Sequence, residues 1–98
     1  MIGKEQSRVL TITVSSGSGS GTITNTWDKC AWFRVVPPDE ADTYTVTVKD
    51  ANGFIILKRT GQEGTLSENL ALSLGIAKTV EIASASADGS YRAIFDMH

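Results

Sequence analysis

Apolar and polar residues alternate along most of this 98-residue chain, and this pattern constrains its fold more than any other feature. In TYTVTVK (43–49), Tyr44, Val46 and Val48 share one face of an extended chain, and threonines occupy the other. Successive side chains of a strand point to opposite faces, so a period of two predicts a half-buried β-strand. The same period occurs in RVLTITVS, TITNTW, TVEIASA and SYRAIFDM, and KCAWFRVV is interpreted as a further strand.

Turn-forming residues separate the alternating segments. Pro37-Pro38 ends one segment because proline has no amide hydrogen to donate to a sheet. DANG (50–53) predicts a type I′ hairpin with positive φ at Asn52-Gly53, and FIILKR follows as the partner strand. In LSENLALSLGIAK (66–78), leucines two residues apart favour extended chain, with a short helix capped by Ser67 as the alternative.

The segments predict seven to eight short strands, spaced about 8–12 residues apart. This spacing is typical of an all-β, antiparallel β-sandwich, immunoglobulin-like or jelly-roll-like, or of a small barrel. The length predicts a single domain over residues 1–98.

The stretch SSGSGSG (15–21) resembles a flexible linker between two predicted strands. A coil of this length spans roughly 14 Å, enough to close a hairpin or to cross between two sheets about 10 Å apart. Only 14 residues precede it, which is too few for an independent core. It is therefore predicted to be a mobile loop (15–21) inside one domain.

Composition argues against several classes of partner. The net charge is −2 and the nine Lys and Arg residues are scattered, whereas nucleic-acid binding needs clustered positive charge. Residues 1–7 contain no apolar stretch like that of a secretory signal, so we expect none, and no apolar run in the sequence is long enough to span a membrane. Cys30 is the only cysteine, so no internal disulfide is possible. We expect synthesis in a reducing cytoplasm, with no nucleic-acid or membrane partner.

The residues that catalysis and metal binding require do not converge in this sequence. The only histidine, His98, is the last residue, and Cys30 lies in an apolar segment as a small buried residue. DEAD (39–42) offers carboxylates suited to calcium, but charged residues at a surface turn need no ligand, and the surface turn is the preferred interpretation. DANG begins like an EF-hand loop, but its glycine comes too early. The sequence predicts no catalytic residues, cofactor or metal, and no enzymatic activity.

Two segments, CAWFRVV and FIIL (54–57), are apolar on both faces, unlike a strand with one wet face. Either a loop such as the Leu-rich segment 66–76 covers the second face, or another subunit does. With Trp32 taken as a core anchor, Phe33 and Val35 are the predicted interface residues. Phe54 and Ile56 of FIIL are also predicted interface residues, although the pattern does not show which face of this segment is buried.

Two resemblances extend this interpretation. ADGSYRA (87–93) resembles the tyrosine-corner region of immunoglobulin-like domains, one residue shorter and without their Cys…Trp…Cys framework. Residues 43–97, with YTVTVKDANGFIIL, LSENLALSLGIAKTVEI and ASADGSYRAIFDM, resemble small β-rich virion proteins of tailed bacteriophages. That resemblance implies a capsid decoration (cement) or tail-associated protein, located in the virion after synthesis in the host cytoplasm.

The predicted function is that of a non-enzymatic structural protein that packs on a larger assembly. Its partners are predicted to be proteins, through self-association as a homo-oligomer, through a virion, or both. The alternative is a carbohydrate-binding or immunoglobulin-like adhesion module, in which Trp27 or Tyr44 would be the exposed aromatic residue.

Overall fold

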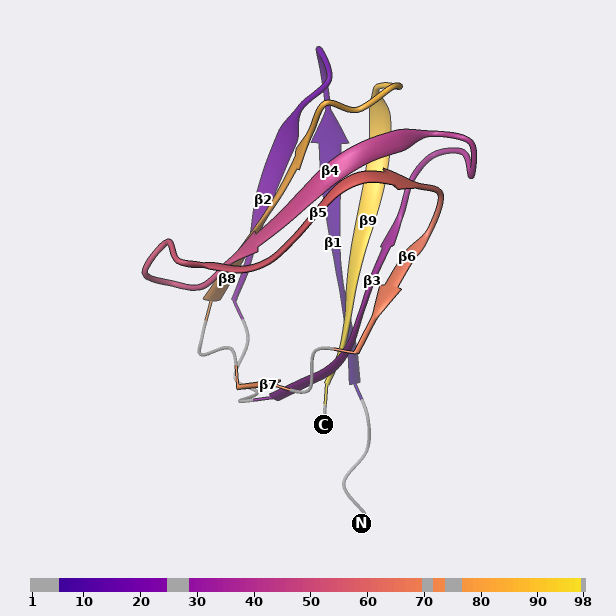
Figure 1. Cartoon of the computed structure of the whole chain (residues 1–98). Coiled ribbons are helices and arrows are strands. Elements are labelled where there is room, and N and C mark those ends of the chain that lie inside the picture. Colours follow the sequence, from indigo (N-terminus) through magenta and orange to yellow (C-terminus); the bar gives the residue numbers. More distant parts are fainter. Residues whose placement is uncertain (1–5, 25–28, 70–71, 74–76, 98) are drawn as a thin grey trace.

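The computed structural model describes residues 6–24, 29–69, 72–73 and 77–97, which form two packed β-sheets without a helix (Figure 1). No helix in this part of the chain is long and apolar enough to cross a membrane. The strands are β1 (Gln6–Val14), β2 (Gly19–Thr24), β3 (Lys29–Val36), β4 (Thr43–Lys49), β5 (Ile55–Glu63), β6 (Leu66–Glu68), β7 (Leu72–Ser73), β8 (Ala77–Ala83) and β9 (Gly89–Met97).

The strand order identifies the type of sandwich. One sheet has the order β1-β9-β3-β6, with the short β7 also paired to β3, and the other has the order β2-β8-β4-β5. All pairings are antiparallel. The pairs are nested around the β4–β5 hairpin: β4 pairs with β5, β3 with β6, β2 with β8, and β1 with β9. A long ribbon of paired strands wrapped into two sheets is a jelly roll. The predicted antiparallel sandwich is confirmed, and the jelly-roll-like form is the one observed.

The Leu-rich segment 66–78 forms short strands. Its described parts are extended, as β6, β7 and the start of β8, so the alternative of a helix beginning at Ser67 is wrong there. The three-residue β6 and two-residue β7 pair with different parts of β3.

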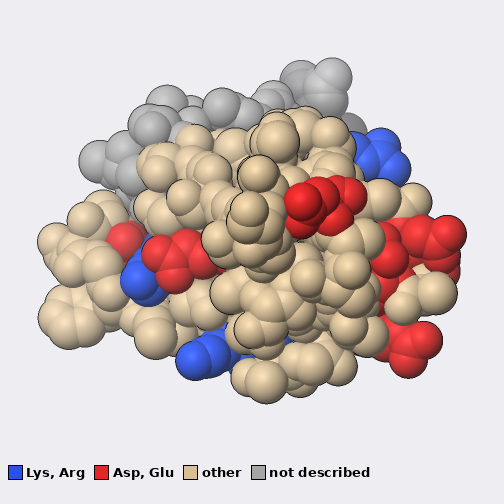
Figure 2. All heavy atoms as spheres, turned by 90° about the horizontal axis from the view of Figure 1, so that it is seen from above, with Lys and Arg blue, Asp and Glu red and all other residues tan. Residues whose placement is uncertain are grey.

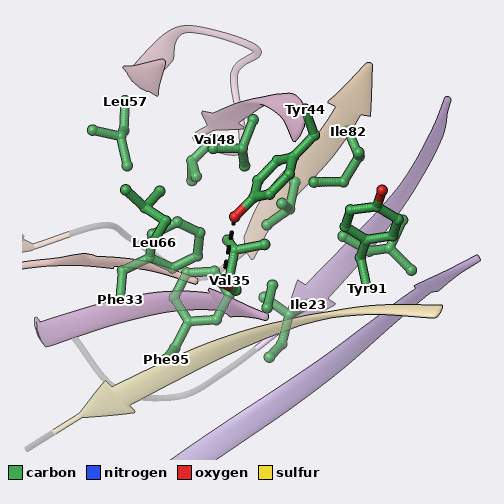
Figure 3. Packing of buried hydrophobic residues seen from close by; sticks show 14 of the residues in the cluster. Ile23, Phe33, Val35, Tyr44, Val48, Leu57, Leu66, Ile82, Tyr91 and Phe95 are labelled. Carbon is green, nitrogen blue, oxygen red and sulfur yellow. Dashed lines mark hydrogen bonds between the residues drawn. The ribbon is translucent and has the colours of Figure 1, made fainter. Parts of the chain in front are cut away.

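Alternating side chains of both sheets fill the space between them (Figure 3). The ring centroids of Phe33 and Phe95 lie 4.9 Å apart, and those of Tyr44 and Tyr91 lie 5.4 Å apart, edge to face. The buried apolar residues are Ile12, Val14, Ile23, Phe33, Val35, Tyr44, Val46, Val48, Leu57, Leu66, Val80, Ile82, Tyr91, Ala93 and Phe95. Lys78 of β8 is also buried.

The Gly/Ser stretch forms a tight turn and the start of a strand. Ser16 and Gly17 both have positive φ, at 55° and 84°, and Ser15 and Ser18 exchange backbone hydrogen bonds of 2.9 and 3.2 Å. These are the features of a two-residue type I′ hairpin. β2 begins immediately afterwards at Gly19, so the prediction of a loop over 15–21 is wrong for residues 19–21.

The β1–β2 turn is also anchored to the β8–β9 connection. The Asp88 carboxylate accepts hydrogen bonds from the amides of Ser16 (3.1 Å) and Gly17 (3.0 Å), and the Gly17 carbonyl accepts one from Ala85 (3.0 Å). At Gly19 a Cβ would lie 2.3 Å from the Thr13 carbonyl oxygen. Glycine is therefore required where the chain passes from one sheet to the other.

The DANG turn is built differently from the prediction. Gly53 has a φ of 87°, as expected, but Asn52 does not have positive φ. The Gly53 amide donates to the Asp50 carbonyl, and the Asp50 side chain accepts from the amides of Asn52 and Phe54. A three-residue loop ending in a left-handed glycine replaces the expected type I′ turn.

The ADGSYRA segment makes the local contact of a tyrosine corner within a different fold. The Tyr91 hydroxyl donates to the carbonyl of Ala87 four residues upstream, at 2.8 Å. Burial, together with the charges of Asp42 and Asp88, raises the pKa of this hydroxyl. The strand order remains that of a jelly roll, so the contact braces the turn before β9 rather than marking an immunoglobulin-like domain.

Candidate interaction surface

The orientation of β3 is the reverse of the predicted one. Phe33 and Val35 are completely buried between the sheets, whereas Trp32 lies on the outside with 38% of its surface exposed. The assignment of Phe33 and Val35 to an interface is therefore wrong, and so is that of Trp32 to the core. Pairing with β9 explains the orientation, because Phe33 lies opposite Phe95 and Val35 opposite Ala93, and both partners face the other sheet.

The outward side chains of β1, β9 and β3 form a surface that we call the Trp32 face. The backbone register places Val9 opposite Ile94, and Ile94 opposite Arg34, so the three belong to one row across the sheet. Val9 is 56% exposed and Ile94 is half-buried. The face comprises Val9, Thr11, Trp32, Arg34, Val36, Arg92, Ile94 and Asp96, with Ser67 of β6 at its edge.

Hydrogen bonds hold the polar members of this face in place. The Trp32 indole nitrogen donates to the Ser67 hydroxyl on the neighbouring β6. Arg34 Nη2 donates to both carboxylate oxygens of Asp96, at 3.1 and 3.4 Å. A partly exposed pair of this kind contributes little to stability, but it orients both charges on the surface.

The outside of the other sheet is polar by comparison. Lys49 Nζ lies 3.1 Å from a carboxylate oxygen of Glu81, and the hydroxyls of Thr22 and Thr79 share a hydrogen bond of 3.2 Å. Thr45 and Thr47 of β4 continue this row, and Ile55 lies opposite Lys49 at the hairpin end of the sheet. This outer face is therefore mainly polar over β2, β8 and β4, as is usual for a sheet face in water, whereas the Trp32 face carries large apolar side chains across its middle.

The β4–β5 hairpin carries a second exposed apolar group and projects from the side of the sandwich (Figure 1). Phe54 is 69% exposed and Ile55 is 57% exposed, while Ile56 is half-buried against the core and Leu57 is buried. The exposed position of Phe54 is compatible with its predicted role in an interface, and that role stays a prediction. In place of Ile56, it is Ile55 that joins Phe54 at the surface.

Acidic side chains gather on one side of the end of the sandwich seen in Figure 2. The carboxylates of the DEAD turn bind backbone amides: Asp39 accepts from Ala41, and Asp42 accepts from Asp39. Glu40 accepts from the hydroxyl and the amide of Thr65, and these bonds lower the pKa of Glu40. Within the described residues no three potential ligands form a metal-binding group. These carboxylates therefore organise loops.

The carbohydrate-binding alternative loses one of its two aromatic residues. Tyr44 is buried, its hydroxyl donates to the Gly64 carbonyl at 2.7 Å, and burial raises its pKa. Figure 3 shows its ring lying between the sheets, so the assignment of Tyr44 to an exposed site is wrong. Trp27 lies outside the described residues.

A shallow hollow beside β2 has a volume of about 290 Å³. Its lining is Ser18, Gly19, Ser20, Glu81, Ile82 and Ala83. It contains no aromatic side chain on which a sugar could stack.

Comparison with known proteins supports the fold. No protein-family model and no curated protein matches the chain. A mitogen from Yersinia pseudotuberculosis is similar in structure, with a TM-score of 0.51 and 13% identity over 98% of this chain and 86% of that one. At this identity the likeness shows the fold alone.

Other solved structures align with lower scores. The core of Drosophila NLP gives a TM-score of 0.49 at 16% identity, covering 95% of this chain and 96% of that one. VP2 of infectious bursal disease virus gives 0.42 at 12% identity, covering 97% of this chain and 33% of that one.

Proposed function

We propose that this protein is a non-enzymatic structural component that works by packing against other protein chains, with the Trp32 face as its contact surface. The observation that carries the proposal is the difference between the two outer faces of the sandwich. One face carries threonines and an ion pair over most of its area, with Ile55 at its hairpin end, while the other presents Val9, Trp32 and Ile94 across its middle. Exposed apolar side chains grouped on one surface are typical of interaction sites.

The hydrogen bonding of this face also suits a docking role. The bond to Ser67 holds the Trp32 ring in one orientation, and the Arg34–Asp96 pair does the same for two charges. A partner that binds a pre-ordered surface avoids part of the entropy cost of association. Aromatic and arginine side chains are also enriched among the residues that dominate binding energy.

The assembly that we propose is a bacteriophage particle, with the chain as a capsid decoration or tail-associated protein. This part rests on the resemblance of residues 43–97 to small virion proteins. A jelly roll with exposed apolar side chains across one outer face suits a protein that reinforces a shell by contact alone. Because a particle presents many copies of each site, a modest affinity at each one gives strong overall attachment.

Mass spectrometry of purified particles, freed of soluble protein on a density gradient, tests this proposal. We expect the chain to sediment with the particles, and purified chain to bind to particles that lack it. Val9→Lys should reduce this binding, because it places a charge in the apolar face. Ala83→Lys, on the outside of the other sheet, is the control and should bind like the wild type. If the chain is missing from the particles, its assignment to a virion is wrong.

A further inference from the structure

We propose that the Trp32 face is occupied by the same face of a second copy of this chain, related by a two-fold axis that crosses the strands at Ile94. This inference rests on the proposed function, since it names the partner at the same surface. Three observations support a second copy: the order of charges along β9, the positions of the apolar side chains, and the size of the face.

Two opposite charges lie at equal distances on either side of Ile94 along β9. The outward residues of this strand are Arg92, Ile94 and Asp96, so opposite charges flank one apolar residue. A two-fold axis across the strand at Ile94 reverses this order in the second copy. Each Arg92 then lies against the Asp96 of the other copy, and the two Ile94 side chains meet. A face that complements its own rotated image favours self-association over a partner of a single charge.

The same two-fold axis also brings apolar side chains of β3 into contact between the two copies. Trp32 and Val36 lie two residues to either side of Arg34, which is opposite Ile94 in the register. The axis therefore places the Trp32 ring of one copy against Val36 of the other. Arg34 approaches its own counterpart, but each guanidinium is already paired with Asp96 of its own chain at 3.1 Å. Each carboxylate oxygen of Asp96 has more than one lone pair, so the group can accept from the second Arg92 in addition to the contacts it makes within its own chain.

The face is large enough for a dimer. β1 and β9 have nine residues each and β3 has eight. With a rise of about 3.3 Å per residue and about 4.8 Å between strands, these three strands and the three-residue β6 cover roughly 460 Å². Two such faces bury about 920 Å² in total, which is the size of a weak, reversible interface.

Sedimentation equilibrium of the full chain over a range of concentrations tests this inference, with circular dichroism to verify folding. We expect a monomer–dimer equilibrium in which Val9→Lys raises the dissociation constant at least tenfold. The matched control is Ile55→Lys, because Val9 and Ile55 are 56% and 57% exposed but only Val9 lies on the Trp32 face. Ile55→Lys should leave the constant within twofold of the wild type. Arg92→Glu, which opposes Asp96 of the second copy, should weaken the dimer at least tenfold.

Any one of four results would overturn the inference. A wild-type chain that stays monomeric up to about 1 mM has no such dimer. A dimer that tolerates Val9→Lys, or one that Ile55→Lys dissociates, uses another surface. If the chain is monomeric and Val9→Lys still abolishes particle binding, the proposed function stands and the face belongs to a different protein. If Arg92→Glu has no effect while Val9→Lys dissociates the dimer, the two-fold axis at Ile94 is wrong.

Discussion

Phe33 and Phe95 lie opposite one another on β3 and β9, with ring centroids 4.9 Å apart and an angle of 42° between the rings. Both side chains are completely buried. Aromatic pairs at this separation add to the stabilisation that burial alone provides. The pair lies in the sheet whose outside is the Trp32 face, so it supports the candidate surface from beneath.

Phe33→Ala should lower the free energy of unfolding by about 3–5 kcal/mol, because it removes a buried ring and leaves a cavity. Urea titration followed by circular dichroism measures this change. Val9→Ala, which truncates an exposed side chain on the same sheet, is the control and should change stability little. A small loss for Phe33→Ala would contradict the buried position.

Gly19→Ala should destabilise the fold, because a Cβ at this position would lie 2.3 Å from the Thr13 carbonyl oxygen. The backbones of β1 and β2 would have to separate, at a cost of about 1–3 kcal/mol. Gly21→Ala is a matched control, since the new Cβ would meet only the flexible Leu10 side chain, at 3.1 Å or more. Thermal melts of the two variants should therefore differ, with Gly19→Ala the less stable. Equal melting temperatures would show that the two strands are not so close.

Gly53→Ala should lower the free energy of unfolding by about 1 kcal/mol, because alanine tolerates positive φ poorly. No atom lies within 4 Å of the added Cβ, so the φ of 87° is the only source of the penalty. Gly53→Asn should recover part of the loss, since asparagine adopts the left-handed region more readily. Denaturant titrations of both variants measure the effect, and an unchanged Gly53→Ala would mean that the turn is built differently.

Asp88→Ala should loosen the β1–β2 turn, because it removes the acceptor of the Ser16 and Gly17 amides. Hydrogen exchange of these two amides, followed by NMR, should become faster than in the wild type. Amides in the middle of β4 should keep their protection and serve as the internal control. Unchanged exchange at Ser16 and Gly17 would show that Asp88 does not hold the turn.

Stability should fall in acid partly through Glu40. Hydrogen bonds from Thr65 lower the pKa of this carboxyl in the folded state below its ordinary value of 4.5. The contribution is therefore complete above pH 4.5, declines as the pH falls, and is lost below the lowered pKa of the folded state. Melting temperatures between about pH 7 and pH 2 should fall less steeply for Glu40→Gln than for the wild type. Parallel curves would exclude this role.

The sequence by itself determined which residues share a face of each strand. Tyr44, Val46 and Val48 were expected together and are buried together, since a period of two is a local property of extended chain. In the same way, Lys78 falls in the inward phase with Val80 and Ile82, and the structure buries all three. The antiparallel sandwich followed from the spacing of such segments and turns.

Only the tertiary structure decided which face points inward where both faces of a strand are apolar. Both faces of CAWFRVV are apolar, so its pattern is equally compatible with a buried Trp32 or a buried Phe33, and pairing with β9 selected Phe33. The Gly/Ser stretch was likewise ambiguous, because its tight turn depends on Asp88, more than 70 residues away. Alternation is encoded by neighbouring residues, whereas burial depends on which distant strand lies opposite, and contacts of that kind form only when the two sheets pack.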